Sequence, residues 1–147
     1  MNMVKPLAPL VLALLALKVG ATEVVTVPLS PDPRIKEHIS SIVGTARKTS
    51  VVLKRNGSSQ TKRLHVDVHG PILNVDVQTL VQWVLTRGEG FWSGSGSWDV
   101  SVIGDAEYAE ISVSMHCGDL CGVGETYTYG RSAGRWTYLY RSDAWIS

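Results

Sequence analysis

The sequence has little net charge, few cysteines and only a short apolar run, and each shortage excludes a class of protein. Fourteen basic and 13 acidic side chains leave a net charge of +1, so the chain lacks the strong basic excess of a general nucleic-acid binder. Its N-terminal apolar run, Leu7–Leu17, is about half of the roughly twenty residues that a membrane-crossing helix needs. We therefore expect no nucleic-acid partner and no integral membrane segment in the mature protein.

The first 21 residues have the three parts of a secretory signal peptide: a lysine-containing start, the apolar run, and the small residues Val19–Ala21. We predict cleavage after Ala21, which would export residues 22–147 as one soluble domain to the periplasm or the exterior. Cleavage removes Lys5 and Lys18 and no acid, so the net charge becomes about −1. No cysteine lies near this position, so a lipid anchor on an N-terminal cysteine is not expected.

Charge is distributed unevenly along the predicted mature chain. Basic side chains crowd into residues 34–63, whereas residues 64–125 hold nine acidic side chains against Arg87 alone. Two interpretations remain open. Either the two segments face each other or the solvent, or the basic segment forms a patch for an anionic partner.

The spacing of apolar residues predicts two helices. At the start of the first, Asp32 stands at the N-cap position and Pro33 at the first helical position, where a missing N–H group costs nothing. The second carries the clearest apolar stripe in the sequence, with Asn74 or Asp76 as its cap and Gly88 as its terminator. Both helices are therefore predicted to be amphipathic.

Alternation of apolar and polar residues predicts seven strands. They are a short strand within residues 22–29, a hairpin that turns at Asn56-Gly57, and four strands between residues 98 and 141. The predicted order is strand, helix, two strands, helix, four strands. We interpret this order as a single α+β domain, in which both amphipathic helices pack on one face of an antiparallel sheet.

The two cysteines, Cys117 and Cys121, lie in the insert HCGDLCGVG between two predicted strands. In an exported protein an even number of cysteines favours a disulfide, which here would lock a turn and set the register of the strands around it. A metal site, with His116 as the nearest further ligand, and redox chemistry are the alternatives. Redox motifs normally place two residues between the cysteines and use a helix N-terminus, and neither feature is evident.

Candidate metal ligands or catalytic groups alternate on one predicted strand as His65, Asp67 and His69. Ligands two positions apart are about 7 Å apart at the backbone and can share a cation, whereas those four positions apart are separated by about 13 Å. A metal site would therefore need a third ligand from another element, such as His38 or His116. The preferred interpretation is a polar outer strand face without a metal or another cofactor.

Aromatic residues provide the candidate binding surface. They alternate on two adjacent predicted strands and also occur in the glycine-rich segment after the second helix: Trp92, Tyr127, Tyr129, Trp136, Tyr138 and Tyr140. If the rows face the helices they form the core, and if they face outward they form a platform for a peptide or a sugar. The acids Glu107 and Glu110 fall on opposite strand faces by alternation, so we predict no catalytic residues.

The last quarter of the chain carries a compound pattern of Cys-Gly-x-Leu-Cys-Gly, a further glycine, a tyrosine-containing strand, Gly-x-Trp and a closing Trp-Ile-Ser. These positions are Cys117, Gly118, Leu120, Cys121, Gly122, Gly124, Tyr127, Gly134, Trp136, Trp145, Ile146 and Ser147. The pattern resembles the C-terminal segment of a group of exported bacterial proteins of unknown function. The resemblance implies a bacterial source, export and a β-rich C-terminal part, and it implies no activity.

Taken together, the residues favour a non-catalytic binding or interaction module with a protein, a peptide or a glycan as its partner. One alternative is a small metal-dependent or acid–base hydrolase that uses the face of His65, Asp67 and His69. A second alternative is an inhibitory or structural partner of another exported protein.

The signal-peptide prediction is tested by producing the full chain in a bacterial host and determining the mass of the exported product. We expect a polypeptide that begins at Thr22, because cleavage follows the small residues that end at Ala21. A product that retains residues 1–21, or a chain that stays inside the cell, would contradict the prediction.

Overall fold

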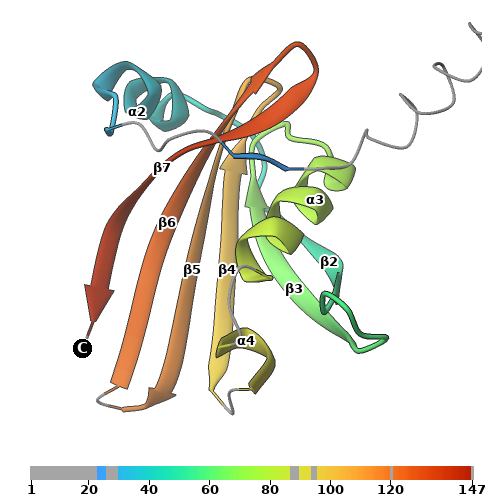
Figure 1. The fold of residues 1–147 in the computed structure, drawn as a ribbon. Helices are drawn as coiled ribbons and strands as arrows, with labels where there is room; N and C mark the ends of the chain where they lie inside the picture. Colours follow the sequence, from blue (N-terminus) through green and yellow to red (C-terminus); the bar gives the residue numbers. More distant parts are fainter. Residues whose placement is uncertain (1–22, 26–29, 87–89, 94–95, 120, 147) are drawn as a thin grey trace, which may run out of the picture.

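A computed structural model of the chain describes residues 23–25, 30–86, 90–93, 96–119 and 121–146. The predicted signal peptide, the predicted helix terminator Gly88 and part of the first predicted strand lie outside these residues. No helix within the described ranges is both long and apolar enough to span a bilayer. The elements, in chain order (Figure 1), are β1 (Val24–Val25), α2 (Pro33–Ser40), β2 (Arg47–Lys54), β3 (Thr61–His69), α3 (Asn74–Leu85), α4 (Gly90–Ser93), β4 (Ser97–Gly104), β5 (Tyr108–Gly118), β6 (Cys121–Ser132) and β7 (Arg135–Ile146).

The strands form one mixed sheet of seven strands in the order β1-β7-β6-β5-β4-β3-β2. The prediction of an α+β domain with two helices packed on one face of an antiparallel sheet is therefore wrong, because the described chain is mostly sheet and the sheet is mixed. Two pairs are parallel, β1 with β7 and β3 with β4. The second follows from the chain itself, because β3 and β4 are joined by a crossover that contains α3, and such a connection brings the second strand back parallel to the first.

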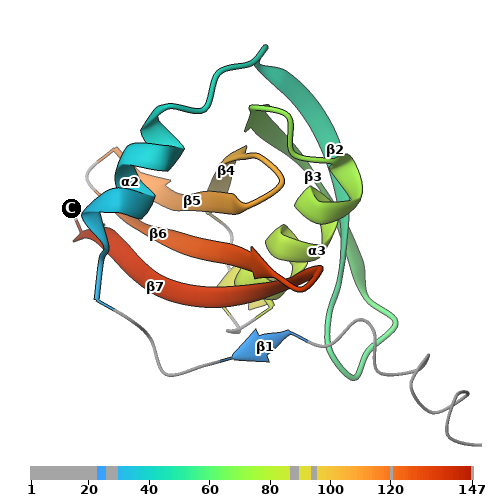
Figure 2. The ribbon, with the colours of Figure 1, turned by 90° about the horizontal axis from the view of Figure 1, so that it is seen from above.

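The two longer helices lie on opposite faces of the sheet. Seen from above, the sheet curls around α3, which occupies its concave face, while α2 lies on the convex face (Figure 2). Alternation along β3 explains this arrangement, because Val66 and Val68 point into the concave core and His69 borders the hollow beneath α2. The prediction that both helices share one face is wrong, because amphipathicity shows that a helix packs on a sheet but not which side of the sheet it covers.

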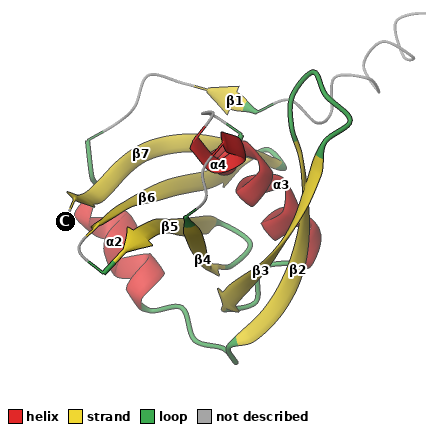
Figure 3. Ribbon diagram, turned by 90° about the horizontal axis from the view of Figure 1, so that it is seen from below, coloured by secondary structure: helices red, strands yellow, loops and turns green. Residues whose placement is uncertain are grey.

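The concave core contains the apolar stripe of α3 and the inward rows of the strands. Its fully buried members include Leu53, Val77, Leu80, Val81 and Ile111. Helix α4 closes one end of this core, where Phe91 packs edge-on against Trp98 at 5.3 Å and both Phe91 and Trp92 are buried. The long β-strands and the central helix therefore enclose a single core (Figure 3).

The free edge of β2 is paired with side chains of α3. Gln78 accepts a hydrogen bond from the N–H group of Val52 at 3.0 Å and donates one to its carbonyl oxygen at 2.7 Å. Gln82 does the same with Lys54, at 2.9 and 2.8 Å. Four helical residues rise about 6 Å and two strand residues about 6.7 Å, so the spacing of the two amides matches the spacing of the backbone groups.

Two irregularities in the β6–β7 pairing decide which face each residue of β7 occupies. Thr128 pairs with Tyr140 but the next residue, Tyr129, pairs with Tyr138, so Leu139 is an extra residue in β7. This bulge turns Tyr140 onto the convex face, whereas Tyr138 stays with the concave core. A second shift, between Gly124 and Thr126, leaves Trp145 opposite Gly124 on the convex face.

Helix α2 is fixed by polar contacts near both of its ends. As predicted, Asp32 caps its start by accepting a hydrogen bond from the N–H group of Arg34 at 2.9 Å, and Pro33 is its first residue. Near its end, Nε2 of His38 lies 2.6 Å from a carboxylate oxygen of Asp105 in the β4–β5 turn. The other oxygen of Asp105 accepts the N–H groups of Glu107 and Tyr108.

The role of the glutamines is tested by Gln82→Glu, which keeps the shape of the side chain but removes its N–H donor. We expect the free energy of unfolding to fall by about 1–3 kcal/mol at pH 7, because the carbonyl of Lys54 loses its partner and faces a carboxylate. Urea unfolding measures the change. Gln60→Glu is the control, because Gln60 lies in the β2–β3 loop, where its side-chain oxygen accepts a hydrogen bond from Arg55. Equal stability of the two variants would contradict the assignment.

The ion pair between α2 and the β4–β5 turn predicts a defined pH dependence. Burial by itself raises the pKa of Asp105, but hydrogen bonds from Tyr108, Glu107 and His38 outweigh it and leave this pKa below its usual value of 3.8. Because the folded state lowers the pKa, ionised Asp105 stabilises the fold above about pH 4, and this contribution is lost as the pH falls through the lowered pKa.

Asp105→Asn tests this contribution. We expect the variant to be less stable than the wild type by about 1 kcal/mol at pH 7, and the difference to shrink below about pH 3, because the introduced amide still accepts the turn's N–H groups but carries no charge. Asp105→Ala, which loses both carboxylate oxygens as acceptors, should have a lower free energy of unfolding than Asp105→Asn at every pH. Denaturant unfolding at several pH values gives the comparison, and a pH-independent difference between Asp105→Asn and wild type would contradict it.

Candidate functional site

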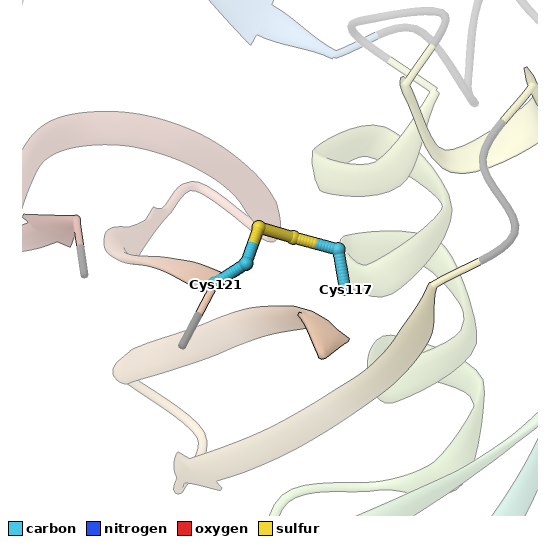
Figure 4. Close-up of a disulfide and its surroundings, with 2 residues drawn as sticks. All are labelled: Cys117 and Cys121. Carbon is cyan, nitrogen blue, oxygen red and sulfur yellow. A yellow bond between two sulfur atoms is a disulfide. The ribbon is translucent and has the colours of Figure 1, made fainter. Parts of the chain in front are cut away.

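The two cysteines are joined in a disulfide at the exposed end of the β5–β6 hairpin (Figure 4). Their Cα atoms are 5.2 Å apart, and the strand pairing continues to Gly118 and Cys121 with a register shift after His116. The predicted disulfide is thus present, and it links the two strands next to their turn. Gly118 has a φ angle of +147°, a conformation that L side chains rarely adopt.

The aromatic residues predicted as a binding surface lie mostly in the core. The buried ones are Trp92, Tyr129, Trp136, Tyr138 and Tyr140. Tyr127 is half-buried against Tyr138. Tyr140 is separated from the other members of its row by the bulge at Leu139 and is buried on the convex side. The rows therefore hold the sheet together and present little surface to a partner.

Tyr127 is held as a hydrogen-bond donor. Its hydroxyl donates to Glu125, and the other carboxylate oxygen of Glu125 accepts from Arg141 at 3.1 Å. Burial and, after it, the hydrogen bond to Glu125 raise the pKa of Tyr127 to about 12. The hydroxyl is therefore neutral at physiological pH, and Glu125 links it to Arg141 on β7.

The strand face of His65, Asp67 and His69 lies on the convex side, as the alternation predicts, but the structure does not bring its members together as one site. Asp67 pairs with the exposed Lys48 at 3.7 Å and borders one groove, whereas His69 borders a separate hollow beneath α2. Within the described part of the chain, no three His, Cys, Asp or Glu side chains gather closely enough to hold a metal ion.

A groove of about 380 Å³ crosses the convex face and is the candidate site. It runs over strands β3 to β7. Its polar lining comes from the outward rows of these strands: Asp67, Asp99, Ser101, Ser112, Ser114 and Thr126. The hydroxyls of Ser112 and Thr126 lie 3.2 Å apart on neighbouring strands, so they form a continuous polar floor.

Trp145 forms one wall of this groove, and the residue is 42% exposed. The ring lies across Gly122 and Gly124, where a Cβ atom on Gly122 would be 3.0 Å from the ring and one on Gly124 would overlap its Nε1 atom. His116 packs on the same side, with its ring centroid 6.0 Å from that of the indole. The two glycines therefore supply a flat seat for an exposed aromatic side chain.

The carboxylates along the groove have basic neighbours. Asp67 is paired with Lys48 and Glu125 with Arg141, and Asp99 lies 3.8 Å from His116. The carboxylates of Asp67 and Asp99 are 69% and 76% exposed, whereas catalytic acids are typically desolvated. This arrangement suits hydrogen bonding to a ligand better than acid–base chemistry.

One serine-containing segment can be interpreted only from its place in the fold. Gly130-Arg131-Ser132-Ala133-Gly134 has the Gly-x-Ser-x-Gly spacing of a hydrolase nucleophile elbow. That motif requires a turn between a strand and a helix, and here the segment reverses the chain between β6 and β7. Ala133 and Gly134 adopt φ angles of 50° and 74°, as a tight hairpin turn requires. The segment is therefore a hairpin turn.

Sequence reasoning missed the groove although its rows are visible in the sequence. Ser112 and Ser114 alternate with Ile111 and Val113, which marks a strand with one apolar and one hydroxyl face. For Trp145 the sequence predicts only packing at the end of the chain. Its position depends on a bulge in β7, which no local pattern predicts.

Comparison of the chain with protein-family models, curated protein sequences and solved structures gave no match.

Proposed function

We propose that the protein is an exported, non-catalytic binding module that takes its ligand in the convex groove. The observation that carries the proposal is Trp145, a large aromatic side chain that stays exposed beside a row of hydroxyl groups while the other aromatic rows are buried. Exposed tryptophans held in a fixed position are typical anchors of binding sites.

Three further features support binding in this groove. The carboxylates at its border are exposed, with Lys48 beside Asp67 and His116 beside Asp99. The disulfide lies directly beside His116 and Gly122, so it restrains two of the residues that contact the indole. The signal-peptide pattern and the resemblance of the C-terminal segment to exported bacterial proteins agree with a role outside the cytoplasm.

The proposal is tested by NMR titration of the isotope-labelled mature chain with separate probes: soluble oligosaccharides, short peptides and peptidoglycan fragments. We expect at least one probe class to shift the indole N–H signal of Trp145, which is assigned by its loss in Trp145→Phe. Gly124→Ala should weaken that binding at least about tenfold, because the new Cβ displaces the ring.

Ile146→Ala is the matched control, since Ile146 is an exposed neighbour that does not border the groove. Its affinity should equal that of the wild type. The absence of any shift at Trp145 with every probe, or binding that is equally strong in Gly124→Ala, would contradict the proposal.

A further inference from the structure

The geometry points to a neutral, linear saccharide as the ligand of the convex groove. This inference rests on the proposed function, because it names the chemical class that the same groove would accept. It is carried by four properties of the groove together: its hydroxyl row, its charge, the paired backbone of its strands and its length.

The hydroxyl row is the first property. Ser101, Ser112, Ser114 and Thr126 come from three adjacent strands, and each hydroxyl can both donate and accept a hydrogen bond. A saccharide presents groups with the same dual capacity along its length. The apolar C–H face of a sugar ring, in turn, suits the exposed indole of Trp145, which combines an apolar surface with one N–H donor.

The balance of charge is the second property. A cationic ligand would compete with Lys48 for Asp67, and an anionic ligand would lie against Asp67 and Asp99. Like charges repel across a binding surface. The groove therefore disfavours an anionic ligand, and Lys48 disfavours a cationic one at Asp67.

The paired backbone of the central strands is the third property, and it argues against an extended peptide. Peptides that add to a sheet bind through the free N–H and C=O groups of an edge strand. Strands β4, β5 and β6 are each paired on both sides, so the floor of the groove offers side chains in place of free backbone groups. Recognition here must come from hydroxyls, carboxylates and the indole.

The length of the groove favours a chain of several sugar rings. Its lining residues come from the five neighbouring strands β3 to β7. Neighbouring strands lie about 4.8 Å apart, so the four intervals span about 19 Å. A single sugar ring beside Trp145 would leave the hydroxyls of β4 and the carboxylate of Asp67 without contact.

Calorimetric titration of the mature chain tests the inference with neutral hexasaccharides and the matching disaccharides of glucose and N-acetylglucosamine. We expect at least one hexasaccharide to bind at least about tenfold more tightly than its disaccharide. Its affinity should change less than about twofold between 50 and 500 mM salt, because a neutral ligand releases no counter-ions. Ser112→Ala combined with Ser114→Ala should weaken binding about tenfold, whereas Ile146→Ala should leave it unchanged.

Two outcomes would overturn the inference, and they separate it from the proposed function. If only a peptide or a charged glycan binds and still shifts Trp145, the groove is a binding site but not one for neutral saccharides. If no probe shifts Trp145, the proposed function fails as well. Circular dichroism of each variant shows whether a loss of binding comes from unfolding.

Discussion

The pairing of Gln78 and Gln82 with the edge of β2 is the contact on which the shape of this domain depends. The two amides provide a donor and an acceptor each, as a neighbouring strand would, and so α3 takes the place of a strand beside β2. An unpaired edge is prone to associate with other chains, and here it is covered from within the same chain. Because α3 also packs against the rest of the concave face, the sheet must curl around it.

This closure explains where a ligand has room. The concave side holds α3 and the buried aromatic rows, which leaves little surface there. The convex side carries the opposite rows of the same strands, and the side chains of these rows in the groove are short and polar. The bulges in β7 place Trp145 on the same side. The disulfide then restrains the hairpin that supports the indole. Core and candidate site are thus the two faces of one set of strands.

Much of the local structure could be predicted from the sequence, but the arrangement of the elements could not. Asp32 and Pro33 predict the start of α2, and Asn56-Gly57 predicts the β2–β3 turn, because caps and turns depend on adjacent residues. The face that each helix covers depends on distant contacts such as His38 with Asp105. The helical pattern alone predicts that Gln78 and Gln82 face the solvent. Their backbone partners become apparent only once the position of β2 is known.

Side chains of α3 take the hydrogen-bonding place of a strand beside β2. Hydrogen exchange of the backbone amides of Val52 and Lys54 tests this most directly. The N–H groups of Val52 and Lys54 point to Gln78 and Gln82. We predict that both amides exchange as slowly as interior strand amides such as that of Val66, and that the double variant Gln78→Met, Gln82→Met, whose side chains lack the acceptor oxygens, releases them selectively. Fast exchange of both amides in the wild type, as at an open edge, would contradict it.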